Sequence, residues 1–155
     1  MDPTYLKAED RSQKDIKGVI GLSGVYRLED LKVDLKLSIT GAGENFKYAT
    51  EVNLFAAVFG TDPEVLKQAS PLTHVRPGLP PFLLMNGGLD YGSLRKMTKE
   101  FTAALKDAGN EVQTKELSRR THETLVFDIL NQTAEPKMVE AIVDFINKGK
   151  REPAR

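Results

Sequence analysis

The sequence of 155 residues contains no cysteine, no tryptophan and no excess charge, because its 22 basic side chains balance 22 acidic ones. The absence of cysteine excludes disulfide frameworks, thiolate zinc sites and cysteine nucleophiles. Nucleic-acid binders usually carry a basic excess and lipid-surface binders a basic amphipathic helix, and the sequence shows neither. A chain of this length folds without a cross-link, since it buries roughly 70% of the surface that its unfolded form exposes.

Long apolar runs are missing as well. No run approaches the roughly 20 residues that a membrane-spanning helix requires. The first seven residues, MDPTYLK, lack the basic region followed by an apolar region that marks a secretory signal. We therefore expect a single domain over residues 1–155 with no recognisable targeting segment, and the compartment is left open.

Three short runs predict a parallel sheet. Residues 16–25 form a short apolar run rich in Val and Ile and bounded by Gly, and residues 82–86 lie between a Pro pair and a Gly pair. Residues 111–117 are more polar, which favours an edge strand. Helical patterns alternate with these runs, and that order implies right-handed crossovers. We predict an α/β fold of about three parallel core strands flanked by helices.

The connecting segments carry their own signals. Ser93 can cap a helix that Gly109 ends, and Asp62 can cap a shorter helix that starts at Pro63. Residues 33–40 alternate between apolar and polar side chains, as in a half-buried strand, and residues 41–51 are loop-like. The stretch between the first two strands of the sheet is therefore irregular.

Chemistry in an open parallel sheet lies beyond the carboxyl ends of its strands. Asp90 follows the second strand by four residues and His122 follows the third by five. Their spacing of 32 residues allows one helix and one strand between them, so both would reach the same rim of the sheet. A carboxylate that holds the proton on one imidazole nitrogen leaves the other nitrogen free as a general base.

Both residues also have a structural explanation. Asp90 stands in a glycine-rich turn, where aspartate is common for turn chemistry alone, and His122 can simply begin a helix. His74, the other histidine, has no carboxylate nearby in sequence and is expected to be structural or exposed. Because two distant histidines form no ligand cluster, we expect no metal site, and no motif predicts a cofactor.

A nucleophile is harder to assign. The turn that presents the serine of many hydrolases has the pattern G-x-S-x-G, in which small residues permit a sharp bend from strand to helix. The sequence contains no such pattern. Residues 21–25 come closest, but Val25 occupies the second glycine position. Ser23 is therefore a weak candidate for the nucleophile.

Several blocks, taken in order, resemble the C-terminal half of α/β-hydrolases of the esterase and lipase branch, which includes carboxylesterases and arylformamidase-like enzymes. The resemblance implies that Asp90 is the acid and His122 the base of a catalytic triad. The family commonly has His-Gly-Asp-x-Asp where this chain has Asn86 and Gly88, and Thr121 replaces a glycine before the histidine. The matching blocks are residues 15–26, 68–75, 80–90 and 121–123.

The resemblance also implies parts that this sequence lacks. The family's first five strands, its oxyanion turn and its nucleophile turn would precede residue 2. The alternating segment 33–40 falls where the family is variable and often contributes to a lid, so we expect a cap-like excursion over residues 26–80. The first hypothesis is the C-terminal part of a serine hydrolase of small-molecule esters or amides, inactive alone. The alternative is a non-catalytic α/β interaction module that forms a homodimer through an exposed strand edge, with no nucleic-acid or membrane partner.

Overall fold

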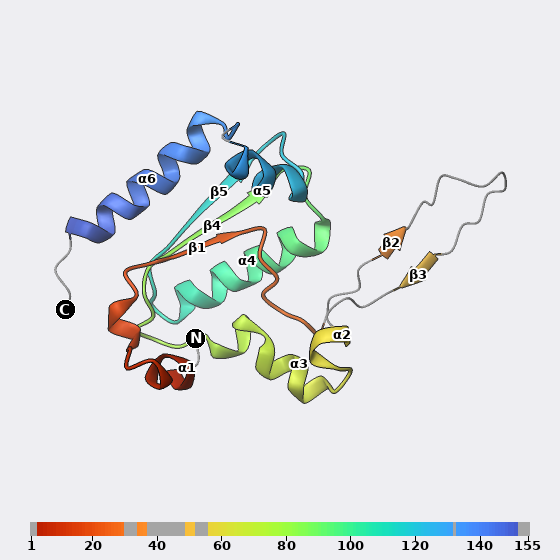
Figure 1. Ribbon diagram of the computed structural model, residues 1–155, viewed down its shortest axis with the longest axis horizontal. Coiled ribbons are helices and arrows are strands. Elements are labelled where there is room, and N and C mark those ends of the chain that lie inside the picture. Colours follow the sequence, from red (N-terminus) through yellow and green to blue (C-terminus); the bar gives the residue numbers. More distant parts are fainter. Residues whose placement is uncertain (1–2, 30–33, 37–48, 52–55, 132, 152–155) are drawn as a thin grey trace.

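The computed structural model describes residues 3–29, 34–36, 49–51, 56–131 and 133–151. A parallel sheet of three strands lies at its centre, in the order β1 (Val19–Leu22), β4 (Phe82–Gly87) and β5 (Val112–Leu117). Helices lie on both faces of this sheet (Figure 1). The predicted α/β fold, with the more polar strand β5 at an edge, is confirmed.

Strand β4 is central because it is apolar toward both faces. All of its residues are buried. Phe82 and Leu84 pack into one apolar cluster, whereas Leu83 and Met85 pack into a second cluster on the opposite face. Successive side chains of a strand point to opposite faces, so only a continuous apolar run can fill both layers.

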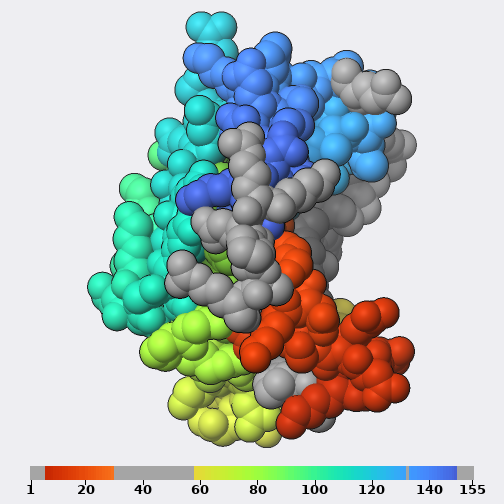
Figure 2. Space-filling model, turned by 90° about the vertical axis from the view of Figure 1, so that its left-hand side faces the viewer, coloured from red at the N-terminus to blue at the C-terminus, as the bar shows by residue number. Residues whose placement is uncertain are grey.

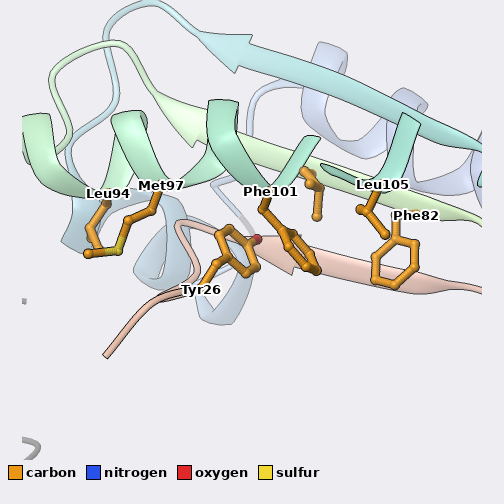
Figure 3. Packing of buried hydrophobic residues seen from close by; sticks show 7 residues of the cluster. Tyr26, Phe82, Leu94, Met97, Phe101 and Leu105 are labelled. Atoms are coloured by element: carbon orange, nitrogen blue, oxygen red, sulfur yellow. The ribbon is translucent and has the colours of Figure 1, made fainter. Parts of the chain in front are cut away.

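Helix α4 (Gly92–Asp107) covers the first face. It buries Leu94, Met97, Phe101 and Leu105, and the ring of Tyr26 stacks on Phe101 with ring centroids 4.4 Å apart (Figure 3). The helix ends before Gly109, whose φ of 75° is the left-handed conformation expected after a helix.

The predicted cap of α4 is wrong. Tyr91 occupies the cap position, so that Ser93 is the second residue of the helix. The carboxylate of Asp90 accepts a hydrogen bond from the Tyr91 N–H at 2.8 Å, and the chain enters the helix directly from this turn. A contact made by the preceding turn therefore overrides the local preference of a serine for the cap.

Helices α5 (His122–Leu130) and α6 (Pro136–Arg151) cover the second face. Their buried side chains, Leu125, Met138 and Phe145, join the cluster that contains Leu83 and Met85. A Cβ on Gly18 would lie 2.7 Å from the Phe145 ring, so the glycine lets α6 cross the chain just before β1. Figure 2 shows α6 in blue toward one end of this side of the molecule and the N-terminal residues in red toward the other.

The remaining elements are short. Strands β2 (Asp34–Lys36) and β3 (Ala49–Glu51) form an antiparallel pair outside the main sheet, which corrects the prediction of a loop through residue 51. Residues 33 and 37–40 of the predicted strand lie outside the described residues. None of the described helices is both long enough and apolar enough to span a bilayer. The other elements are α1 (Pro3–Ala8), η1 (Gln13–Asp15), α2 (Ala56–Phe59), α3 (Pro63–Ala69) and η2 (Pro71–His74).

The predicted cap of α3 is confirmed. Asp62 accepts a hydrogen bond from the Glu64 N–H at 2.9 Å, and Pro63 is the first helical residue. Proline suits this position because its fixed φ is helical and its missing N–H would have no partner there. Here the local sequence signal and the structure agree, since the hydrogen bond to the Glu64 N–H is the one hydrogen bond of the Asp62 carboxylate among the residues that the structure describes.

A candidate acid and base site at the strand ends

The candidate site lies where β4 and β5 end side by side. Gly87 is paired with Leu117, so the turns that follow the two strands leave the sheet at the same rim. The Gly88 N–H donates to the Leu117 carbonyl at 2.8 Å, and the Leu89 N–H donates to the Arg120 carbonyl at 3.0 Å. These backbone hydrogen bonds join the two turns into one unit.

Gly87 and Gly88 are required by the close approach of the two turns. A Cβ on Gly87 would overlap the carbonyl oxygen of Arg120, and one on Gly88 would lie 2.5 Å from the carbonyl oxygen of Ser118. Both obstacles are backbone atoms, which cannot swing aside as the end of a side chain can. The glycine pair therefore brings the segment that carries Asp90 against the segment that carries His122.

Asp90 is a buried carboxylate whose side chain is 0% exposed. Its Oδ1 accepts from the Tyr91 N–H at 2.8 Å and lies 3.4 Å from His122 Nδ1. Its Oδ2 accepts a hydrogen bond from the Ser23 hydroxyl. Burial of a charged group is costly unless hydrogen bonds replace its water, and here both oxygens have partners.

His122 is the first residue of α5, and Thr121 before it is the cap, whose hydroxyl accepts from the Thr124 N–H. Its buried Nδ1 has no hydrogen-bond partner, and the 3.4 Å to Asp90 exceeds a well-formed hydrogen bond. Such bonds are often long in unliganded enzymes and shorten when substrate binds. The side chain is 37% exposed, so the ring also has an accessible side.

Arg120 fixes the turn before His122. Its Nη1 lies 2.6 Å from Asp128 Oδ2 on α5, and its Nε lies 3.4 Å from Glu135 Oε1, one residue before α6. These partly buried ion pairs connect the turn to both helices of the second face. The position of the His122 backbone is thus set by packing as well as by the strand end.

Tyr91 lies near the His122 ring and is hydrogen-bonded to Glu123, the residue after His122. The Tyr91 hydroxyl donates to Glu123 Oε1 at 3.1 Å, and its ring centroid is 5.6 Å from that of His122. This hydrogen bond to a carboxylate raises the pKa of Tyr91. The pKa of Glu123 is lowered by a backbone N–H and by the hydroxyls of Thr121 and Tyr91. A negative charge therefore stands beside the imidazole at neutral pH.

The structure gives Ser23 a partner other than His122. Ser23 follows β1 directly, is 3% exposed, and donates its hydroxyl hydrogen to Asp90 Oδ2. A triad serine must instead donate to the free imidazole nitrogen, so this geometry does not favour Ser23 as the nucleophile. From the sequence, Ser23 is a candidate only as the nucleophile, and its contact with Asp90 is missed. The place of Ser23 directly after the strand beside β4 indicates the rim where it lies, but not which side chain it contacts.

The structure brings together Asp90 and His122 as the sequence predicts, and their catalytic role stays a prediction. His74 lies in η2, where its Nε2 contacts the Gln68 carbonyl oxygen at 2.6 Å, outside this site. Among the described residues, no group of three or more potential ligands could hold a metal ion. A separate groove between α4 and β5, lined in part by Asn86, Arg95 and Thr114, includes neither Asp90 nor His122.

The chain is similar to known esterases over part of its length. It is 33% identical over 97 residues to Esterase LipQ of Mycobacterium tuberculosis, a match that covers 61% of this chain and 22% of that protein. The chain thus spans about a fifth (22%) of the length of this relative. No family model matches the sequence.

Parts of solved structures are similar to this chain. The acylaminoacyl peptidase of Pyrococcus horikoshii aligns with a TM-score of 0.51 and 21% identity, over 72% of this chain and 17% of that one. Esterase 2 of Thermogutta terrifontis aligns with a TM-score of 0.45 and 24% identity, over 70% of this chain and 34% of that one. The alignment with the peptidase supports the α/β-hydrolase fold, and the similarity to Esterase LipQ confirms the resemblance of this chain to part of an esterase.

Proposed function

We propose that this chain supplies the acid and the base of a serine carboxylic-ester hydrolase. The observation that carries the proposal is the buried Asp90 carboxylate 3.4 Å from the Nδ1 of His122, a residue whose ring is partly exposed. Asp90 keeps the imidazole proton on Nδ1, so that Nε2 accepts the proton of an attacking serine hydroxyl and later passes it to the leaving group. We propose a small-molecule ester or amide as substrate, and the similarity to Esterase LipQ supports the ester.

In this proposal the attacking serine comes from outside this 155-residue sequence, which contains no G-x-S-x-G pattern and spans 22% of the length of Esterase LipQ. The Ser23 hydroxyl is engaged by Asp90, and within the described ranges no serine hydroxyl is hydrogen-bonded to His122. An imidazole base without an oriented nucleophile gives little acceleration of ester cleavage. We therefore expect the 155-residue chain to show little or no esterase activity by itself.

The proposal is tested by hydrolysis of p-nitrophenyl butyrate. The 155-residue chain is expected to react at nearly the buffer rate, and Ser23→Ala is expected to leave that rate unchanged. A longer chain that carries a serine turn of the G-x-S-x-G type in the same reading frame is expected to be active. In that chain Asp90→Asn and His122→Gln should each lower kcat by roughly 10³ to 10⁴.

His74→Gln is the matched control, since it removes the other histidine from a position outside the site. Strong hydrolysis by the 155-residue chain that Ser23→Ala abolishes would show that the nucleophile is Ser23, against the assignment made above. An active longer chain that is insensitive to substitution of Asp90 and His122 would remove their catalytic roles.

A second candidate function is a non-catalytic interaction module. The observation in its favour is the position of β1 at the end of the sheet, where no described strand pairs with its outer edge. Ile20 in this strand is 36% exposed. An unpaired edge of this kind offers backbone donors and acceptors to a strand of another chain.

A further inference from the structure

We propose that Ser23 is a positioning residue that holds Asp90 in the orientation that His122 needs. The catalytic meaning of this role rests on the proposed function, in which Asp90 is the triad acid. The contact between Ser23 and Asp90 does not depend on that proposal. Ser23 and Asp90 are 67 residues apart in sequence and follow neighbouring strands, β1 and β4. The hydroxyl of Ser23 donates to Oδ2 of Asp90, whereas the other carboxylate oxygen, Oδ1, faces His122.

The backbone of Ser23 is held in place by a hydrogen bond to β4, independently of the contact between its side chain and Asp90. The Ser23 N–H donates to the Met85 carbonyl at 2.8 Å, which continues the pairing of β1 with β4 one residue past the strand. Ser23 is 3% exposed and the Asp90 side chain 0% exposed, so water has no access that would replace the hydroxyl. The direction of the hydroxyl is therefore set by the sheet.

Ser23 adopts a backbone conformation that serine usually avoids. Its φ is 45°, in the left-handed region where a side chain is strained and glycine is favoured. A glycine here would relieve the strain but would have no hydroxyl. Strained residues of this kind persist where the surrounding structure enforces them, and they cluster at functional sites.

The side chain of Tyr26 packs against this turn and helps to fix its conformation. A Cβ on Gly24 would lie 2.5 Å from Cζ of Tyr26, and one on Gly21 would overlap the Tyr26 hydroxyl oxygen. The two glycines therefore admit the ring beneath the turn, where it stacks on Phe101 of α4 with its oxygen directed toward β1 (Figure 3). The sequence Gly-Leu-Ser-Gly-Val-Tyr thus folds as a turn that presents one hydroxyl to Asp90.

The two oxygens of Asp90 have separate partners. Oδ1 faces His122 Nδ1 and the Tyr91 N–H, whereas Oδ2 binds Ser23. Without the hydroxyl, Oδ2 would lose its partner and the Tyr91 N–H alone would hold the carboxylate, so Oδ1 would be a less firmly oriented acceptor for His122. The Ser23 hydroxyl therefore influences which tautomer His122 adopts. A carboxylate held by Ser23 favours the proton on Nδ1 of neutral His122 and leaves Nε2 free.

The test reads this tautomer directly by long-range ¹H–¹⁵N NMR at about pH 9, where imidazole is neutral. The native chain is expected to hold the proton mainly on Nδ1 of His122. Ser23→Ala and Ser23→Gly should both lower the ratio of the Nδ1–H to the Nε2–H form by roughly two- to tenfold, the range that one net hydrogen bond supports. Asp90→Asn gives the reference without the carboxylate.

Two variants at Ser23 separate the hydroxyl from the backbone. Alanine keeps the strained φ, whereas glycine relieves it, and both remove the hydroxyl. Ser70→Ala is the matched control, because Ser70 is also buried and donates to the Leu66 carbonyl, away from the site. His74 provides an internal reference in every spectrum, and if the alanine variant does not fold, the glycine variant carries the test.

An unchanged ratio in folded Ser23→Gly protein would overturn the proposal, as would an equal shift in Ser70→Ala. A shift in the alanine variant alone would also overturn it, because strain rather than the hydroxyl would then be responsible. The tautomer measurement needs no substrate, so its result can contradict the positioning role of Ser23 without contradicting the proposed function. If the tautomer ratio of His122 depends on Ser23 but the longer chain shows no esterase activity, the proposed function is rejected and the positioning role of Ser23 stands.

Discussion

At the scale of single residues, the site is a set of short polar contacts around one buried carboxylate. Asp90 and His122 could be predicted because each follows a recognisable strand, and residues that follow parallel strands meet at one rim. The contact with Ser23 could not be predicted, because it depends on a positive φ at that serine and on a turn filled by Tyr26. Neither property has a local sequence signal.

The electrostatics beside His122 can be tested through the titration of Tyr91. Its pKa is raised because the neutral phenol donates to Glu123 and because ionisation would place two negative charges together. Glu123→Gln is therefore expected to lower the pKa of Tyr91 toward the ordinary value. In a spectrophotometric titration of phenolate absorbance, the variant should ionise one tyrosine at lower pH than the native chain.

Two comparisons make this titration specific. Tyr26 provides an upper reference, because burial raises its pKa to about 12. Glu116→Gln is the matched control, since Glu116 pairs with Arg95 at 3.3 Å and not with a tyrosine. Superimposed curves for Glu123→Gln and the native chain would mean that the carboxylate does not act on Tyr91 in solution.

At the scale of elements, periodicity predicted the strands of the main sheet and the apolar face of α4, because each reflects which side chains must be buried. It failed where a partner far away in sequence decides the outcome. Strand β3 forms because it pairs with β2, and α4 begins at Gly92 because Asp90 binds the backbone before it. The glycine pair at the end of β4, Gly87 and Gly88, is a further example, because glycine is needed there only by the close approach of the turn after β5.

That need gives a prediction for Gly87→Ala. A methyl group at Gly87 would overlap the Arg120 carbonyl, so the two turns must separate. We expect the free energy of unfolding to fall by about 1–3 kcal/mol, which is the usual cost of forcing extra volume into a packed site. Urea unfolding followed by circular dichroism measures the change.

Gly92→Ala is the control for this substitution. Gly92 is the first residue of α4, and a Cβ there would meet no atom within 4 Å. Alanine is a better helix former than glycine, so this variant should be neutral or more stable by roughly 0.5–1 kcal/mol. Equal stability of Gly87→Ala and the native chain would show that the turns are not held as closely as the glycine contacts require.

At the scale of the whole molecule, apolar side chains remain on the outside of the second face. Val139, Val143 and Ile146 follow one another at helical spacing along α6, and each is between 44% and 46% exposed. Ile20 of β1 points to the same face of the sheet as Leu22, which packs into the cluster beneath α6. Extended apolar surface of this kind usually marks an interaction site.

Within the described part of the chain no strand covers the outer edge of β1, and this edge leads us to predict a homodimer. Two copies related by a twofold axis can pair their β1 strands edge to edge, which satisfies the outward backbone groups of both. Light scattering at micromolar concentration is expected to give twice the mass of one chain.

Ile20→Lys should shift the population to monomer, because charged side chains on an edge strand oppose such pairing. Val58→Lys, which alters an exposed residue of α2, should leave the dimer intact. A native chain that is strictly monomeric would rule out this interface, and a dimer that tolerates Ile20→Lys would place the contact elsewhere, with the stripe on α6 as the next surface to substitute.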